Sequence, residues 1–372
     1  MITIEEIKDK KGMRQFVCFP FSIYKSNPYW VPPLIKDEIS SFDNKKNPVF
    51  EHAKARFFIA LKNNSIVGRV ATIVNKHETE KQGIKKIRFG WFDIIDNIQV
   101  SRALLEKVKE LARQQGLKYI EGPMGFNNLD KVGVLVEGFN YTGNMATWYN
   151  YPYYKTHLEK LGFKKEKEYI EGKFCYSEVN TQKYIKAGNL IQKKYQLKDL
   201  NFSSRKQIMP YVDEMFSLLE KTYSKLPSYI PLSEKERDYF KKKYLNFINP
   251  ELVKFVLDQN NKMLAFSIVI PSFSKALQKA RGKLFPLGLL YLLRAKKYYK
   301  DIVFYLIGIH PDFQNKGLNA VIFKEYIKTF KNKKIENCIR TPELIENTAV
   351  HQLWKNFNPK IYKRRRTYRF DL

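Results

Sequence analysis

Two stretches of the chain share one pattern of apolar and polar positions. Residues 56–75 and 252–271 each contain a run rich in Val, Phe and Ile, then an Asn-Asn pair, then a second apolar run. Such runs separated by Asn predict β-hairpins, because Asn tolerates the left-handed backbone of a tight turn. The sequence therefore predicts two hairpins, with turns at Asn63-Asn64 and Asn260-Asn261.

A strand, a helix and another strand are predicted after each hairpin. In the first half they are residues 86–95, 101–116 and 118–122, and in the second half residues 301–309, 321–330 and 337–341. The repeated order predicts two homologous α/β domains, residues 1–180 and 181–372, joined near residues 181–201. Strand–helix–strand units also favour at least one parallel strand pair in each domain.

Composition supports two folded domains. The 372 residues are 44% hydrophobic and 15% aromatic, which is ample for two cores. The longest apolar run, Leu284–Leu293, is broken by Pro286 and Gly288 and is too short to span a bilayer, and the first residues contain no signal-peptide core. The three Cys residues are isolated and the five His residues show no ligand spacing, so we expect a cytoplasmic protein without disulfides or metal.

The net charge of +30 is the strongest compositional signal. It indicates attraction to an anionic partner, which could be nucleic acid, a membrane surface, a phosphorylated cofactor or an acidic protein. The alternative is that most of these charges are solvated Lys residues on helix faces.

The segment HPDFQNKGLNA, residues 310–320, lies between a predicted strand and a predicted helix. Backbone N–H groups at a helix N-terminus favour an anion, Gly317 permits close backbone approach, and Lys316 adds a cation. The corresponding first-half segment, residues 96–104, has no glycine. This asymmetry favours a retained anion site over an ordinary turn that binds nothing.

The same residues carry a resemblance to the Gcn5-related N-acetyltransferase (GNAT) superfamily. Gln314, Gly317 and Asn319 stand on that family's Q/R-x-x-G-x-G/A loop, and residues 346–362 are similar to its N-x-x-A-x-x-L-Y segment, with Trp354 in the usual Tyr position. Residues 153–163 supply a Leu-Gly-Phe ending in the first half. The chain resembles bacterial two-domain GNAT-like proteins.

The resemblance implies two tandem GNAT-like domains of α/β (α+β) class. Each would be a mixed, mostly antiparallel twisted sheet flanked by helices. The first would have a degenerate cofactor loop. The second would carry the cofactor loop 310–320 and a basic insert at residues 272–300.

The resemblance also implies acyl transfer from a coenzyme A thioester to an amine. The diphosphate of acyl-CoA would be held by the loop and its flanks: Ile309, Gln314, Asn315, Lys316, Gly317, Leu318, Asn319 and Ala320. A backbone N–H at Gly308 or Ile309 would stabilise the developing oxyanion.

Three residues are candidates for the proton transfers of this reaction. Glu343 or Glu346 would take a proton from the amine, and Tyr305 would replace the family's usual Tyr as proton donor. Structural alternatives exist for each. Glu346 could only flank a helix that Asn347 caps, and Tyr305 could be a sheet residue.

Two basic segments allow several interpretations. The insert at residues 272–300 has eight Lys and Arg residues and no Asp or Glu. It could be a lid, an amphipathic surface for a membrane or an acidic carrier protein, or a packing helix. Residues 360–370 carry six cations, which could track a phosphate backbone or could alternate along a last strand.

The sequence thus favours an acyl-CoA-dependent N-acyltransferase with a small-molecule or peptide amine as acceptor. The alternative from another class is a non-catalytic binder of an anionic macromolecule, or one dependent on aminoacyl-tRNA or an acyl carrier protein. A third interpretation is a scaffold in which both copies are degenerate.

Overall fold

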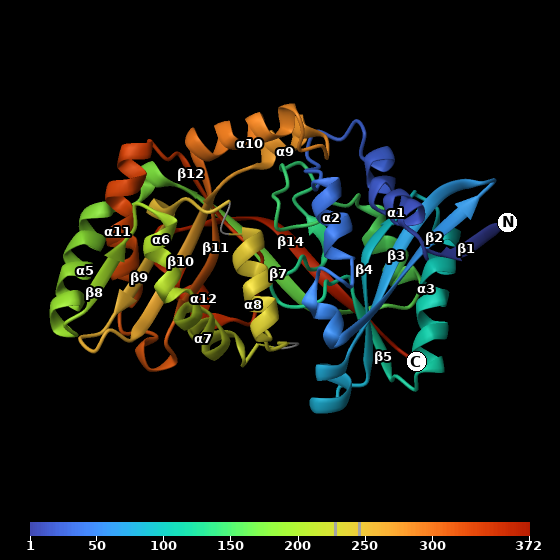
Figure 1. The fold of residues 1–372 in the computed structure, drawn as a ribbon, viewed down its shortest axis with the longest axis horizontal. Coiled ribbons are helices and arrows are strands. Elements are labelled where there is room, and N and C mark those ends of the chain that lie inside the picture. The colour runs from blue at the N-terminus through green and yellow to red at the C-terminus, as the bar shows by residue number, and fades with distance from the viewer. Residues whose placement is uncertain (227–228, 245–246) are drawn as a thin grey trace. The chain divides into compact units, whose positions relative to one another are not determined.

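A computed structural model describes residues 1–226, 229–244 and 247–372, and the chain divides into two compact units (Figure 1). Unit 1 comprises Met1–Ile170, Ser274–Leu292 and Tyr362–Leu372, and unit 2 comprises Glu171–Phe273 and Leu293–Ile361. Both units are therefore discontinuous in sequence. The division into homologous domains at residue 180 stays a prediction.

Unit 1 is built on a six-stranded path with the order β1-β2-β3-β4-β5-β14. All neighbouring pairs are antiparallel except β4–β5, which is parallel. Helix α3 packs against one side of the sheet and α1 against β2, β3 and β4. The strands are β1 (Ile2–Glu6), β2 (Ala53–Lys62), β3 (Ser65–Asn75), β4 (Lys86–Ile94), β5 (Tyr119–Gly122), β6 (Val134–Glu137) and β14 (Lys360–Asp371). The helices are α1 (Lys10–Ile23), α2 (Ile35–Ser41), α3 (Ile98–Gln114), α4 (Tyr153–Lys160) and α9 (Ser274–Ala280).

Unit 2 repeats this arrangement with the order β8-β9-β10-β11-β12-β7, in which only β11–β12 is parallel. The prediction of mixed, mostly antiparallel sheets flanked by helices is confirmed. The strands are β7 (Lys164–Cys175), β8 (Lys198–Asn201), β9 (Val253–Leu257), β10 (Met263–Pro271), β11 (Asp301–Ile309), β12 (Asn337–Arg340) and β13 (Glu343–Leu344). The helices are α5 (Thr181–Lys194), α6 (Arg205–Ile208), α7 (Val212–Tyr223), α8 (Glu234–Tyr244), α11 (Leu318–Lys333) and α12 (Thr348–Trp354). Helix α10 (Leu287–Lys297) crosses the boundary between the units, as do strands β7 and β14.

The sixth strand of each sheet comes from the other half of the sequence. In unit 1, the C-terminal strand β14 pairs with β5 through Tyr368–Asp371. In unit 2, β7, which follows the helices of the first half, pairs with β12 through Lys173–Cys175. The strand order thus repeats in the two units, but the sixth strand of each comes from the other half of the chain.

Local sequence signals account for most of the other elements. Helix α11 buries Leu318, Ile322, Tyr326 and Phe330, four residues apart, as an amphipathic helix requires. Asn63 and Asn64 both have positive φ at the first hairpin turn, whereas at the second turn Asn261 has positive φ. The predicted linker near residues 181–201 forms α5 and β8 of unit 2.

The basic insert contains α9 and α10. Helix α9 is fixed within unit 1, because Ser274 Oγ donates to the Gly143 carbonyl at 2.8 Å and Gln278 Nε2 donates to the Trp30 carbonyl at 3.0 Å. Within the described residues, no helix combines the length and the apolar character needed to cross a membrane.

Many cations of the C-terminal strand bind groups of the protein itself. In unit 1, Arg364 and Arg366 both donate to the carboxylate of Glu168, at 2.9 and 2.7 Å, and the buried Arg365 donates to the Trp148 carbonyl at 2.6 Å. These contacts favour the interpretation of the tail as a strand over a phosphate-binding track.

Candidate functional site

The two parallel strands of unit 2 diverge halfway along β11. The pairing of β11 with β12 runs from Asp301 to Phe304, whereas its pairing with β10 continues to Ile309. A register shift opposite Ile268 and Val269 of β10 marks the point of divergence. A bulge of this kind bends a strand and redirects its backbone groups.

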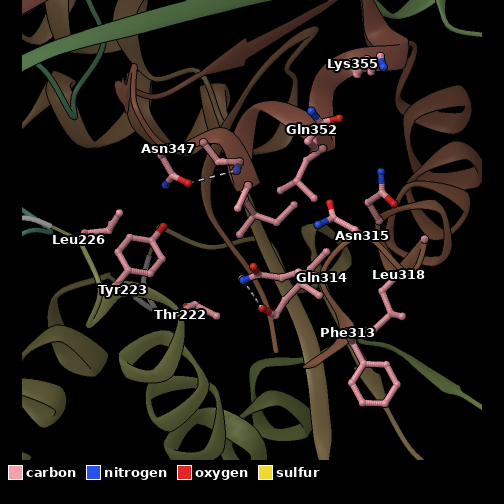
Figure 2. Close-up of a pocket in the computed structure, with 18 of the residues that line it drawn as sticks. Thr222, Tyr223, Leu226, Phe313, Gln314, Asn315, Leu318, Asn347, Gln352 and Lys355 are labelled. Atoms are coloured by element: carbon pink, nitrogen blue, oxygen red, sulfur yellow. Dashed lines mark hydrogen bonds between the residues drawn. The ribbon is translucent and has the colours of Figure 1, made fainter. Parts of the chain in front are cut away.

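The backbone of Ile309 faces away from β10. The His310 amide donates to the Leu264 carbonyl of β10 at 2.8 Å, and backbone groups alternate direction along a strand. The Ile309 carbonyl accepts instead from Gln314 Nε2 at 3.3 Å, on the other side (Figure 2). The Ile309 N–H points to the same side as its carbonyl, toward the opening between the strands.

A cavity of about 380 Å³ occupies this end of unit 2. Figure 2 shows side chains from α7, the loop after β11, α11 and α12 converging on it. Its lining residues are Thr222, Tyr223, Leu226, Ile307, Gly308, Ile309, Phe313, Gln314, Asn315, Gly317, Leu318, Asn319, Asn347, Ala349, Val350, Gln352, Leu353, Lys355 and Asn356.

The loop after β11 leaves the start of α11 without a side-chain cap. Asn315 and Gly317 have φ of 60° and 86°, and Gly317 is the N-cap residue of α11, with no side-chain cap hydrogen bond. The first backbone N–H groups of a helix have no intrahelical acceptor and carry partial positive charge. The start of α11 is therefore suited to an anion at the wall of the cavity.

The corresponding strand end of unit 1 is closed by the protein's own groups. Ile94, like Ile309, is the ninth residue of its strand, and its amide donates to the Tyr154 hydroxyl at 3.0 Å. The Tyr153 hydroxyl donates to the Ile94 carbonyl at 2.7 Å, and Asn97 caps α3 by accepting from the Gln99 amide. The end of this strand is therefore hydrogen-bonded to tyrosine side chains in unit 1, whereas in unit 2 it borders the cavity.

The structure brings most of the predicted cofactor-binding residues together. Six of them line the cavity: Ile309, Gln314, Asn315, Gly317, Leu318 and Asn319. Lys316 and Ala320 are not among the lining residues. The Lys316 ammonium lies 5.2 Å from the ring centre of Phe313, and the Ala320 amide donates to the Gly317 carbonyl at 2.9 Å.

None of the three predicted catalytic residues lines the cavity. Glu343 accepts from Trp354 Nε1 at 2.8 Å, is ion-paired with Arg340, and lies 3.4 Å from His351 Nδ1. The Glu343 carboxylate is therefore already engaged by three neighbours, and its hydrogen bond to His351 raises the pKa of that imidazole.

The other two catalytic candidates are the exposed Glu346 and the half-buried Tyr305. Glu346 is exposed just before α12, which Asn347 caps by accepting from the Val350 amide at 3.3 Å. Tyr305 lies at the bend of β11, with its ring 6.0 Å from that of Tyr244. Trp354, in the usual Tyr position of the resemblance, is buried against Phe304 at 4.9 Å between ring centres.

Sequence reasoning missed Tyr223, the last residue of α7. Its ring lies at the cavity (Figure 2), and burial raises the pKa of its phenol above the ordinary value, with Glu343 and then Tyr305 adding to the rise. Tyr223 is half-buried, and a phenol whose pKa is raised keeps its proton at neutral pH. No local motif surrounds Tyr223, so only its position in the fold identifies it.

Polar residues of α12 and of the positions that flank it line a further part of the cavity. Asn347, Gln352, Lys355 and Asn356 all line the cavity. Among the residues that the structure describes, no group of three or more His, Cys, Asp or Glu side chains is placed to hold a metal ion. The site offers amides, hydroxyls, the Lys355 ammonium and a helix N-terminus as its binding groups.

Comparisons with known proteins agree with this architecture. No protein-family model matches the chain. A tandem GNAT protein from the clavulanic acid biosynthesis pathway is similar in structure, with a TM-score of 0.58 and 9% identity over 100% of this chain and 98% of that one. The chain therefore has the fold of a tandem GNAT protein, as the sequence predicted.

Two curated proteins are similar over almost their whole length. Protein YghO of Escherichia coli (strain K12) is 25% identical over 97% of this chain and 93% of its own. Bacterial ceramide synthase of Caulobacter vibrioides is 23% identical over 99% of this chain and 97% of its own.

Proposed function

We propose that the protein is an N-acyltransferase that uses an acyl-CoA as donor at the cavity of unit 2. The observation that carries this proposal is the uncapped start of α11 beside the open end of β11. The diphosphate of the donor would bind the amides of Leu318 and Asn319 at this helix start. Fold similarity to a tandem GNAT protein supports acyl transfer as the reaction class.

The thioester carbonyl would lie beside the open edge of β11. The Ile309 N–H faces this edge and would donate to the carbonyl oxygen as negative charge develops. The amine nitrogen of the acceptor forms a bond to the carbonyl carbon, and the carbon–sulfur bond breaks. The products are an amide and free coenzyme A.

Two proton transfers complete the balance of the reaction. Tyr223, a protonated phenol at the cavity, would give its proton to the departing thiolate. Glu343 is held by Arg340 and Trp354, so we propose that the exposed Glu346 takes the amine proton through water. Glu346 does not line the cavity itself but adjoins Asn347, which does. In this assignment Glu343 fixes His351 and Trp354 of α12, and Tyr305 has no chemical role.

The name of one relative favours a long-chain acceptor. The chain is similar over nearly its full length to a bacterial ceramide synthase. A ceramide is the N-acyl derivative of a long-chain amino alcohol, so this likeness supports a lipid amine rather than a peptide amine as acceptor. It also makes a long-chain acyl-CoA a natural first donor to test.

The direct experiment is a two-way screen with the purified full chain. Acetyl-, octanoyl- and palmitoyl-CoA are each combined with a long-chain amino alcohol, a short amine or a peptide amine, and release of the coenzyme A thiol is followed. We expect thiol release that requires both an acyl-CoA and an amine. No release in any combination, together with no rise in melting temperature with any acyl-CoA, would contradict the proposal.

The alternative of an RNA-binding or carrier-dependent protein rests on the net charge of +30. If the acyl-CoA screen fails while the chain binds RNA with an affinity that falls steeply with salt, that alternative is favoured.

A further inference from the structure

Helix α10 and Phe285, two residues before it, expose a row of large apolar side chains. The four most exposed are Phe285, Leu287, Leu290 and Leu293, with exposed fractions of 64, 56, 59 and 53%. The three leucines recur every three residues, so they lie close to one face of the helix. Contiguous exposed apolar side chains of this size mark an interaction surface more often than isolated ones do.

The opposite side of α10 is covered. Gly288 and Leu292 are buried, so the helix packs through that side and presents the leucine row outward. The first half of α10 is thus apolar on both sides, although only one side is packed. A helix that is apolar on two sides is normally covered on both, so we expect the exposed side of α10 to contact a further apolar surface.

Cations surround this apolar row. Arg281, Lys283, Arg294 and Lys297 are exposed, and the segment from residue 272 to residue 300 contains no acidic residue. The exposed Tyr298 accompanies them, with Arg294 Cζ 5.6 Å and Lys297 Nζ 5.2 Å from its ring centre. Apolar side chains flanked by Arg, Lys and Tyr are typical of helices that lie in a membrane interface.

The segment that precedes α10 is held within unit 1. Helix α9 is held by the Ser274 and Gln278 hydrogen bonds, and the Gly282 carbonyl accepts from the Ile35 amide at 2.9 Å. These contacts anchor the chain just before Phe285, so the apolar row projects from an ordered base.

We propose that Phe285 and α10 form a membrane-binding surface that docks onto an anionic lipid bilayer. The leucines and Phe285 would enter the boundary between headgroups and acyl chains, and the flanking cations would meet lipid phosphates. A second copy of this chain is a poorer partner, because a symmetric contact would bring the same cations together. An acidic carrier protein matches the charge but offers no comparable apolar layer.

This surface is outside the cavity of unit 2, and its role does not depend on the acyl transfer reaction. None of its residues lines that cavity. The two proposals can therefore fail separately.

Flotation with lipid vesicles tests the membrane surface. The full chain is mixed with vesicles of phosphatidylcholine alone or of phosphatidylcholine with 30% phosphatidylglycerol. We expect at least tenfold tighter binding to the anionic vesicles and a steep loss of binding at high salt. Equal binding to both vesicles, or no binding to either, would overturn the proposal.

Variants assign the binding to α10. The triple variant Leu287→Ser, Leu290→Ser, Leu293→Ser is expected to lose at least tenfold in vesicle affinity. The pair Arg294→Gln, Lys297→Gln is expected to lose about fivefold for each removed cation. Matched controls lie on other helices: Leu190→Ser, where the leucine is 68% exposed on α5, and Lys328→Gln with Lys331→Gln on α11. These controls should bind vesicles as the wild type does.

Two further measurements distinguish the causes of a loss of vesicle binding. The melting temperature of the triple variant, with and without an acyl-CoA, reports whether the chain folds and whether the cavity of unit 2 still binds. A folded triple variant that retains wild-type vesicle binding contradicts the proposal. Binding to a purified acyl carrier protein, with no binding to anionic vesicles, would replace the membrane with the carrier as partner.

Discussion

The amide of Ile94 donates a hydrogen bond to the hydroxyl of Tyr154 at 3.0 Å inside unit 1. Tyr154 also shares a 2.8 Å hydrogen bond with Tyr24, so its hydroxyl links a strand end to helix α1. At the equivalent strand end of unit 2, Ile309 faces a cavity. In unit 1 the backbone groups at this strand end are hydrogen-bonded to tyrosine hydroxyls of the protein itself. In unit 2 the equivalent strand end borders a cavity that can admit a ligand.

This hydrogen bond predicts the effect of Tyr154→Phe. The change leaves the Ile94 N–H and the Tyr24 hydroxyl without this partner in a buried site, so the free energy of unfolding should fall by about 1–3 kcal/mol. Affinity for an acyl-CoA should not change, because the donor site is in unit 2. Denaturant unfolding and ligand titration measure the two effects.

Tyr298→Phe is the matched control, since Tyr298 is an exposed residue, 63% accessible to solvent. If Tyr154→Phe weakened acyl-CoA binding while stability stayed the same, the assignment of the donor site to unit 2 alone would be wrong.

Tyr223→Phe tests the proposed proton donor. Removal of a general acid lowers kcat by roughly 10²- to 10⁴-fold, and donor affinity should remain close to that of the wild type. Because burial raises the pKa of Tyr223, its proton stays on the phenol below about pH 10, and wild-type activity should not decline through loss of this proton until the pH exceeds that value.

Tyr305→Phe is the comparison variant for this experiment, because the sequence made Tyr305 a candidate proton donor. A large loss of kcat in Tyr305→Phe, with normal kcat in Tyr223→Phe, would restore the sequence-based assignment. The reverse pattern is the one we expect.

A buried ion network predicts how unit 1 responds to acid. Lys86 lies 2.8 Å from Glu78 and 2.7 Å from Glu121, and Arg88 donates two hydrogen bonds to Glu78. Burial opposes ionisation of Glu78, but Arg88 and then Lys86 outweigh it and lower the pKa of this carboxyl. The stability that Glu78 contributes is thus present above pH 4.5 and lost as the pH falls through its lowered pKa.

Glu78→Gln should reduce the free energy of unfolding by about 3–5 kcal/mol at neutral pH, since it leaves Arg88 and Lys86 buried without their shared carboxylate. The loss relative to the wild type should shrink as the pH falls below 4.5. The control Glu110→Gln, at an exposed pair with Lys107, should unfold like the wild type. An equally small effect of both variants would show that the network does not stabilise the unit.

The sequence predicted the elements whose signals are local. The Asn-Asn turns, the apolar spacing of α11 and the glycine of the β11–α11 loop each act within a few residues, and each appears in the structure. The structure gives a reason for the glycine at position 317: its φ of 86° favours glycine, and a Cβ added there would lie 3.1 Å from the side chain of Ile191.

Long-range features were not predictable in this way. The pairing of Tyr368 with Gly122 joins strands far apart in the chain, and nothing local specifies the partner of β14. The same holds for Tyr223, which reaches the cavity only because α7 packs against β10 and β11. The sequence made Glu343 a candidate base, but in the structure its carboxylate is ion-paired with Arg340 and accepts a hydrogen bond from Trp354.

The central claim is that the uncapped start of α11 binds the diphosphate of an acyl-CoA, and Asn319→Glu tests it most directly. A carboxylate in the first turn favours the helix itself, so the variant should fold. Two like charges about 4 Å apart near a protein surface repel by about 4 kcal/mol, so affinity should fall by at least about tenfold. Asn332→Glu adds the same charge at the exposed far end of α11 and serves as the control.

The decisive measurement is calorimetric titration of coenzyme A into the wild type, Asn319→Glu and Asn332→Glu. We expect binding to the wild type and to Asn332→Glu with similar affinity, and binding at least about tenfold weaker to Asn319→Glu. Equal affinity for all three proteins, or no binding to the wild type, would contradict the account.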